Sequence, residues 1–125
     1  MHQPDLLTCG DVIIIALPAH IPRGRGQKGT RPAVVVGVPE GEIRYPMVVI
    51  APLTIQTGSW SNNNLSLYPR LEAGTGGLLQ PSIVLLDQIR GIDASRVLSY
   101  LGTLISEQYA VIFAGLMQLF RQKGG

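Results

Sequence analysis

Arg31 and Thr54 are the two side chains whose positions best suit chemistry on a charged substrate. Arg31 stands at the mouth of a run of apolar β-formers (residues 33–36), so that strand is held in the interior while its first residue reaches solvent. Pro32 disfavours the helical region for the residue before it, which predicts an extended Arg31 at the start or the edge of a strand. A guanidinium fixed in this way can offer its planar set of donors to a carboxylate or a phosphate.

The strand that follows should bring Thr54 beside Arg31. Residues 33–38 and 47–53 both read as strands, and the polar turn region between them, residues 39–46, is too short for a parallel crossover. If the two strands pair antiparallel, the start of one lies next to the end of the other, where Thr54 stands. The sequence therefore predicts that Arg31 and Thr54 lie side by side and form part of a site.

A basic segment precedes this pair. Residues 23–31 contain four cations and no acid: Arg23, Arg25, Lys28 and Arg31. Prolines and glycines interrupt residues 18–30, which predicts a mobile loop rather than a helix or a strand. Two readings stay open for this segment, a solvated loop that keeps the surface soluble and a surface for a polyanion.

Length and composition predict one domain with a partner. Residues 10–125 form a single domain in this reading, and residues 1–9 form a loose lead-in. Hydrophobic residues make up 46% of the 125 and charged ones 14%, against roughly 25% charged in an average soluble protein, so a second subunit should cover part of the apolar surface. Cys9 is the only cysteine, and neither a signal segment nor a membrane span is recognised, which indicates the cytoplasm.

The remaining pattern predicts a small, strongly bent sheet of five to seven strands with a terminal helix. Further strands are expected at residues 12–17, 65–68, 82–86 and 97–104, and Asp93 as the N-cap of a short helical turn. Ser106 caps the terminal helix, which runs to about Arg121. Because its interior carries no charge after Glu107, this helix should be buried broadly, against the sheet and a second copy.

The familiar catalytic sets are absent. Cys9 lies in the lead-in, no nucleophile elbow accompanies His2 or His20, and no metal ligands cluster. Cleavage of RNA by its own 2′-hydroxyl needs less, because the substrate brings the nucleophile. The protein must then bend the backbone into line, neutralise charge at phosphorus and help one proton move.

Four blocks of the sequence resemble the MazF/PemK family of toxins. The blocks are Gly10-Asp11-Val12, then Gly24-Arg25-Gly26-Gln27-Lys28-Gly29-Thr30-Arg31-Pro32-Ala33-Val34-Val35-Val36, then Val49-Ile50-Ala51-Pro52-Leu53-Thr54, and Pro81-Ser82-Ile83-Val84-Leu85-Leu86-Asp87-Gln88-Ile89-Arg90-Gly91-Ile92-Asp93. They come in the family's order, and with the terminal helix they cover most of the chain. The resemblance implies an SH3-like barrel of the MazF/CcdB-like toxin fold, mainly β with a C-terminal helix, that forms a homodimer.

The resemblance also implies an activity and partners. It implies a metal-independent, cofactor-free endoribonuclease that cuts single-stranded RNA at a specific sequence, leaving 2′,3′-cyclic phosphate and 5′-hydroxyl ends. It further implies a MazE-like antitoxin whose acidic segment occupies the RNA groove. The family's catalytic pair falls on Arg31 and Thr54, and the RNA-binding residues are expected to be Arg23, Arg25, Gln27, Lys28 and Gln56.

Other roles stay open. His20 and Asp87 are candidates for a base or a supporting group, while Asp87 could instead bond backbone or Arg90 and His20 could be a bystander. Trp60, Tyr68 and Tyr45 could stack on unpaired bases or serve packing. The first loop departs from the family, with Gly26 where a Glu is usual and a longer stretch at residues 18–22, which bears on rate and RNA preference.

Two alternatives are kept. The chain could be an RNA-binding module of the same fold that has lost turnover through its altered loop. It could also be a CcdB-like inhibitor of DNA gyrase, although that relative depends on a C-terminal Trp-Gly-Ile and residues 121–125 here read Arg-Gln-Lys-Gly-Gly. Arg31 itself could be paired with a nearby acid, and Thr54 could be an ordinary strand-end threonine.

Overall fold

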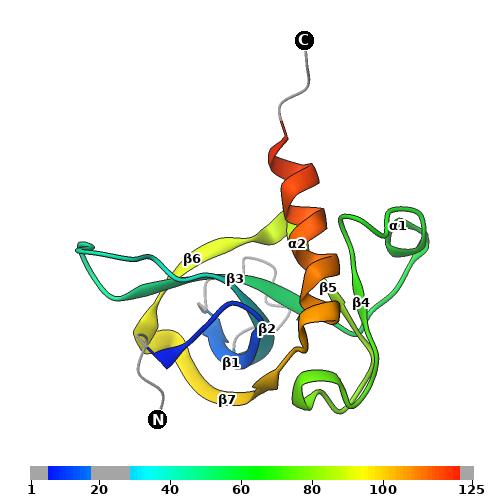
Figure 1. The fold of residues 1–125 in the computed structure, drawn as a ribbon. Helices are drawn as coiled ribbons and strands as arrows, with labels where there is room; N and C mark the ends of the chain where they lie inside the picture. Colours follow the sequence, from blue (N-terminus) through cyan, green and yellow to red (C-terminus); the bar gives the residue numbers. More distant parts are fainter. Residues whose placement is uncertain (1–5, 18–28, 122–125) are drawn as a thin grey trace, which may run out of the picture.

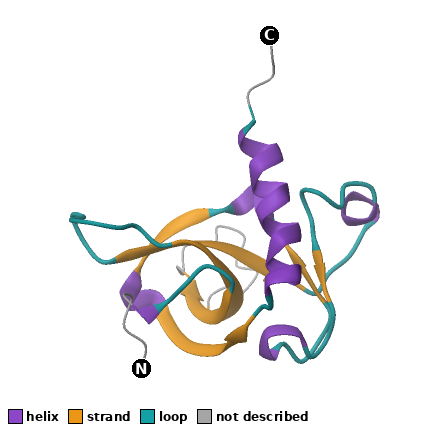
Figure 2. Cartoon of the chain, viewed as in Figure 1, coloured by secondary structure: helices purple, strands orange, loops and turns teal. Residues whose placement is uncertain are grey.

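The computed structural model describes residues 6–17 and 29–121, which form an antiparallel sheet curled into a half-barrel with a helix standing against it (Figure 1). The strands are β1 (Asp11–Leu17), β2 (Gly29–Gly37), β3 (Met47–Thr54), β4 (Arg70–Leu71), β5 (Ser82–Val84), β6 (Arg90–Asp93) and β7 (Val97–Thr103). The helices are α1 (Ser59–Asn62) and α2 (Ser106–Phe120), with 3₁₀ turns η2 (Thr75–Gly77), η3 (Leu86–Gln88) and η4 (Ala94–Arg96). The predicted bent sheet with a terminal helix is confirmed (Figure 2).

β3 is the strand on which the sheet is built. The order is β4-β5-β3-β2-β1-β7, and β6 also pairs with β3. One edge of β3 pairs with β2, while its other edge pairs first with β6 (Met47 opposite Asp93) and then with β5 (Thr54 opposite Ile83). The end of β3 is therefore held between β2 and β5, which is where polar groups from three chain segments can meet.

β2 begins earlier than the sequence pattern predicts. The sequence predicts a strand over residues 33–38 with Arg31 extended at its start, whereas the strand begins at Gly29. β1 continues alongside it, with Ile14 opposite Pro32 and Leu17 opposite Gly29, whereas the recorded pairing with β3 begins at Ala33. This end of β2 is a local sheet edge, where a proline is accepted.

Side chains of successive strand residues point to opposite faces of the sheet, and each face packs against its own hydrophobic cluster. Val12, Val34 and Leu53 join a cluster that includes Ile112 and Leu116 of α2. Ile13, Val35 and Ile50 join a second cluster with Leu7 and Ile92. Leu7 is 4% exposed and so packs in the core, although the sequence reading assigned it to the lead-in.

α2 buries a narrower stripe than predicted. Ile112, Gly115 and Leu116 are buried, at the spacing of one helical face. Several apolar side chains of α2 are exposed instead: Val111, Phe113, Met117, Leu119 and Phe120. The sheet therefore covers one face of α2, and the rest of the predicted burial is left to a second copy.

Local hydrogen bonds set where η4 and α2 begin. Asp93 caps η4 as predicted, accepting from the Ser95 N–H at 2.9 Å, and this bond lowers the pKa of Asp93. Ser106 is not the cap of α2: Ile105 takes that position, and its N–H donates to the Gln108 side chain at 3.0 Å. The helix ends at Phe120.

The prediction of a strand at residues 65–68 is wrong, because this segment is a turn. The Leu67 N–H donates to the Asn64 side chain at 3.3 Å, and the Tyr68 N–H donates to the Asn64 carbonyl at 3.0 Å. Asparagine side chains compete with the sheet ladder in this way and favour turns. The segment is a turn that follows α1, and it carries Tyr68 toward the end of β3.

Among the helices of residues 6–17 and 29–121, none is long and apolar enough to cross a membrane.

Candidate active site

Arg31, near the start of β2, and Thr54, at the end of β3, come together at the open end of the β2–β3 hairpin, away from its turn. Ala33 lies opposite Pro52 and Val34 opposite Ala51, and the same register continued toward the strand ends sets Arg31 opposite Thr54. Both residues are half-buried and line the same two hollows. The juxtaposition predicted from the two strand ends is thus present in the structure.

The backbone of Arg31 is held by its neighbours on β1. Ile15 lies opposite Arg31, so the residue sits within the ladder rather than in the preceding segment. The chain enters β2 through Gly29, whose φ of +111° lies in the region that residues with a Cβ rarely adopt. A glycine at this point lets the strand begin two positions before Arg31 and fix its backbone.

Two adjoining hollows form what we call the Arg31 groove. They share Arg31, Thr54 and Gln56. The first has a volume of about 410 Å³ and is also lined by Thr30, Pro32, Leu53, Ile55 and Ser82. The second has a volume of about 320 Å³ and is also lined by Trp60, Tyr68, Leu85, Asp87 and Gln88. Both volumes fall in the range of about 300 to 1,000 Å³ typical of ligand sites.

Thr54 is oriented by the chain that follows it. The Gln56 N–H donates a hydrogen bond to Thr54 Oγ1 at 3.2 Å. A hydroxyl can accept and donate at once, so this bond leaves the Thr54 O–H to act as a donor. The arrangement suits a negatively charged oxygen in the groove.

Asp87 lies at the other end of the groove and is bonded to Tyr68. The Tyr68 hydroxyl donates to Asp87 Oδ2 at 2.7 Å, and this hydrogen bond, with burial and the negative carboxylate, raises the pKa of Tyr68. The sequence suggested the backbone or Arg90 as the partner of Asp87, but the side-chain partner in the structure is Tyr68. Tyr68 lies 19 residues before Asp87, so local spacing could not identify it. The groove therefore has a cation at its centre and an anion at one end.

The other residues expected in the site divide into three groups. Gln56 and Asp87 line the groove, as do Trp60 and Tyr68. Tyr45 does not: it lies on the exposed β2–β3 connection, with the Arg44 guanidinium 6.0 Å from its ring centre. His20, Arg23, Arg25, Gln27 and Lys28 lie outside the described residues.

Ser82 and Gln88 line the groove without having been assigned a role from the sequence. Ser82 is 5% exposed, and its hydroxyl donates to the Gln80 carbonyl at 3.0 Å. The pairing of β5 with the end of β3 brings Ser82 there, and that pairing joins segments separated by a long loop. No local signal identifies it.

In the part of the chain that the structure describes, no three His, Cys, Asp or Glu side chains are grouped as ligands for a metal ion.

Comparison with solved structures shows which fold this is. A mycobacterial endoribonuclease in complex with its cognate antitoxin is 16% identical, with a TM-score of 0.64 over 95% of this chain and 97% of that one. Mycobacterium tuberculosis toxin MazF-mt6 is 20% identical, with a TM-score of 0.65 over 91% and 99%. MazF in a MazE-MazF crystal form from Deinococcus radiodurans is 20% identical, with a TM-score of 0.65 over 91% and 95%. These proteins share the fold of this chain.

Among curated protein sequences no significant match is found. The model of one protein family does match, the PemK-like, MazF-like toxin of type II toxin-antitoxin systems, over residues 8–120. The match spans all seven strands and α2, and the resemblance read from the four sequence blocks is confirmed. The chain belongs to the PemK-like, MazF-like family of toxins.

Proposed function

We propose that this toxin is a metal-independent endoribonuclease that cleaves single-stranded RNA, mRNA above all, at a specific sequence. The observation that carries the proposal is the convergence of Arg31 and Thr54, from facing ends of β2 and β3, on one groove. A fixed cation and a hydroxyl donor form a site for a phosphodiester, and such a site needs no metal if the substrate supplies its own nucleophile.

The proposed reaction uses Arg31 and Thr54 as follows. The 2′-oxygen of the substrate attacks the adjacent phosphorus, a 2′-O–P bond forms, and the P–O5′ bond breaks. Negative charge builds on the equatorial oxygens, where the Arg31 guanidinium neutralises it and the Thr54 hydroxyl donates a hydrogen bond. The proton of the 2′-hydroxyl leaves to a base and a proton reaches the departing 5′-oxygen. The products carry a 2′,3′-cyclic phosphate and a 5′-hydroxyl.

Two groups are candidates for the base. Asp87 lines the groove with one oxygen engaged by Tyr68. His20 lies on the segment that leads into β2, and imidazole titrates near neutrality. Asp87→Asn and His20→Gln separate them, because only the change at the true base strongly lowers the turnover number of RNA that is already bound.

The basic segment is proposed to hold the RNA backbone. It joins the end of β1 to the start of β2, and those two ends lie opposite one another at Leu17 and Gly29, beside Arg31. Arg23, Arg25 and Lys28 would contact phosphates, with Gln27 and Gln56 as polar partners. Binding through these cations releases counterions and therefore weakens as salt rises.

An acidic, partly disordered antitoxin of MazE type is proposed as the protein partner. Structures that share the fold include an endoribonuclease with its cognate antitoxin and a MazE-MazF complex. A flexible acidic segment would use the same cations as RNA. Antitoxin and RNA should then compete in a binding assay, and simultaneous binding without loss of affinity would contradict a shared groove.

The function is tested by incubating purified protein with a long single-stranded RNA in EDTA and mapping the fragment ends. Cuts at a short recurring motif are expected. Thr54→Val keeps the shape and removes the donor, and should slow cleavage by about 10²-fold. Arg31→Ala should slow it by about 10³-fold or more, because the charge on phosphorus is then unopposed.

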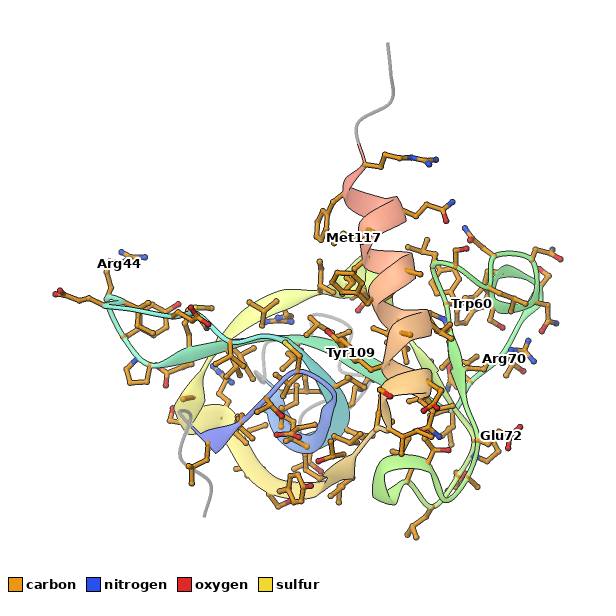
Figure 3. All side chains as sticks on the ribbon, viewed as in Figure 1. Arg44, Trp60, Arg70, Glu72, Tyr109 and Met117 are labelled. Carbon is orange, nitrogen blue, oxygen red and sulfur yellow. The ribbon has the colours of Figure 1, made fainter. Side chains whose placement is uncertain are left out.

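Arg44→Ala is the matched control, since it removes a guanidinium from the exposed hairpin on the side of the molecule opposite Trp60 (Figure 3). Its cleavage rate should equal that of the unaltered protein. RNA that is bound but left intact by the folded toxin would point instead to the binding module of the same fold.

A further inference from the structure

The second hollow of the Arg31 groove holds an aromatic unit that the cleavage reaction does not use. Trp60 and Tyr68 have ring centres 4.8 Å apart with an interplanar angle of 80°, so the edge of one ring meets the face of the other. Trp60 is 42% exposed and lines the hollow together with Arg31, Thr54 and Asp87. A large indole left open beside a phosphate site suits a flat apolar ligand.

The indole is held rigidly. A Cβ on Gly58 would lie 2.6 Å from Trp60 Nε1 and 2.8 Å from Cδ1, so the ring is seated directly on the Gly58 backbone. Ser61 is fully buried and locks this turn, because its hydroxyl donates to the Gly58 carbonyl at 2.9 Å and accepts from the Gly58 N–H at 3.2 Å. A ligand that stacks on Trp60 would therefore find the ring already in place.

The charges of the hollow separate two parts of a nucleotide. Arg31 attracts a phosphate, whereas the carboxylate of Asp87 at the far end repels one. The same carboxylate accepts hydrogen bonds from the amino group of a nucleobase. Its Oδ2 is engaged by Tyr68, which leaves Oδ1 for such a donor.

We infer that Trp60, Tyr68 and Asp87 form a base-binding subsite for the nucleotide next to the scissile phosphate. Trp60 stacks on the base, Asp87 accepts from its exocyclic amino group, and Tyr68 positions both by contacting the indole and donating to the carboxylate. The subsite favours bases with an exocyclic amino group, with cytosine and adenine as the test cases, over uracil, which has none. This inference deepens the proposed function and rests on it.

Trp60 is the only tryptophan of the chain, so its fluorescence reports on this subsite alone. The probes are 2′-O-methyl oligocytidylate, oligoadenylate and oligouridylate of about eight nucleotides, a length in the usual range of single-strand sites. They cannot be cleaved, because the 2′-oxygen is blocked. Cytidylate and adenylate should quench Trp60 and bind about tenfold more tightly than uridylate.

The variants divide stacking from selectivity. Trp60→Ala should weaken binding of a dye-labelled cytidylate by about tenfold, measured by fluorescence anisotropy, and Trp60→Phe should restore part of it. Tyr68→Phe and Asp87→Asn should keep stacking, seen as quenching, and lose the preference over uridylate. Gly58→Ala should displace the indole and act like Trp60→Ala without altering the ring. Tyr45→Ala, an exposed aromatic on the distal hairpin, should change nothing.

Each contrary outcome is separable from failure of the proposed function. Oligonucleotides that bind with no change in Trp60 fluorescence, or that bind Trp60→Ala as tightly as the unaltered protein, would overturn the subsite while RNA cleavage stands. Quenching by an acidic peptide and not by oligonucleotides would assign Trp60 to a protein partner instead. If the unaltered toxin neither binds nor cleaves RNA, both proposals fail.

Discussion

Thr54 illustrates how one backbone contact prepares a side chain for chemistry. Its hydroxyl oxygen accepts from the Gln56 N–H, which leaves the O–H free to donate, and Thr54 lines the groove shared with Arg31. Tyr68 and Asp87 are prepared in the same manner, by a hydrogen bond that joins a turn to η3. In both cases a polar side chain is held by a partner outside its own strand or turn, which lowers the entropy lost when a ligand binds.

The Tyr68 to Asp87 bond makes a pH prediction. Because the bond requires a neutral phenol, it raises the pKa of Tyr68 above the ordinary value near 10. Its contribution to stability is present below that ordinary pKa and is lost as the pH rises through the raised value. In Asp87→Ala, tyrosine ¹³C NMR should find Tyr68 titrating at lower pH than in the unaltered protein.

Tyr109 is an internal control for that titration. Burial and the neighbouring Cys9 raise the pKa of Tyr109 far above its ordinary value, and Asp87 is not among the causes, so Tyr109 should stay protonated in both proteins while Tyr68 titrates. An unchanged Tyr68 titration in Asp87→Ala would mean that the bond is not formed in solution.

α2 is positioned by a close approach rather than by helix propensity. Gly115 faces the turn that carries Ser66, and a Cβ there would overlap the Ser66 carbonyl oxygen and lie 2.7 Å from Leu86 Cδ1. A glycine inside a helix usually costs about 1 kcal/mol relative to alanine. Here it allows the helix to pack onto η3 and the turn before β4, which form one wall of the groove.

Gly115→Ala should therefore destabilise the protein, although propensity alone predicts a gain. Overpacking of this kind costs about 1 to 3 kcal/mol of the free energy of unfolding, measured by urea denaturation. Gln118→Ala, on the exposed side of the same helix, should change it by only a few tenths of a kcal/mol. A more stable Gly115→Ala protein would show that α2 can move away from Ser66 without loss.

At the scale of the whole molecule, an apolar face of α2 is left uncovered. The exposed side of α2 includes Phe113, Met117 and Phe120, which are 51%, 47% and 60% exposed. Leu98 and Tyr100 of β7, an edge strand of the sheet, are also exposed. Because α2 carries no charge after Glu107, we propose a second copy of the chain as the partner that covers this area.

Met117→Glu should convert the dimer to a monomer, because it would bury an unpaired carboxylate at the contact. The measurement is molar mass by light scattering after size-exclusion chromatography. Gln118→Glu adds the same charge one residue further along α2 but replaces an exposed polar side chain, so it should leave the dimer largely intact. If the unaltered protein is a monomer at all concentrations tested, a second copy does not cover α2.

The amino-acid sequence predicts the strands that hold Arg31 and Thr54, because unbroken apolar runs and proline placement are local properties. Arg31 and Thr54 can be located from two apolar runs and the short connection between them. The four blocks also identify the family. The pattern fails at residues 65–68, where Asn64 bonds the backbone into a turn, and at Ser106, which is not the helix cap.

The rest of the site depends on contacts between distant segments. Ser82 reaches the groove through the pairing of β5 with β3, and Trp60, Tyr68 and Asp87 meet only once the turn after α1 has packed beside η3. The sequence shows which functional group each of these residues carries. It does not show which residue each one contacts, because those contacts join segments that are far apart in the chain. The residue types and the strands that carry Arg31 and Thr54 follow from the sequence, whereas the shape of the groove and the pairing of Asp87 with Tyr68 follow from how distant segments pack together.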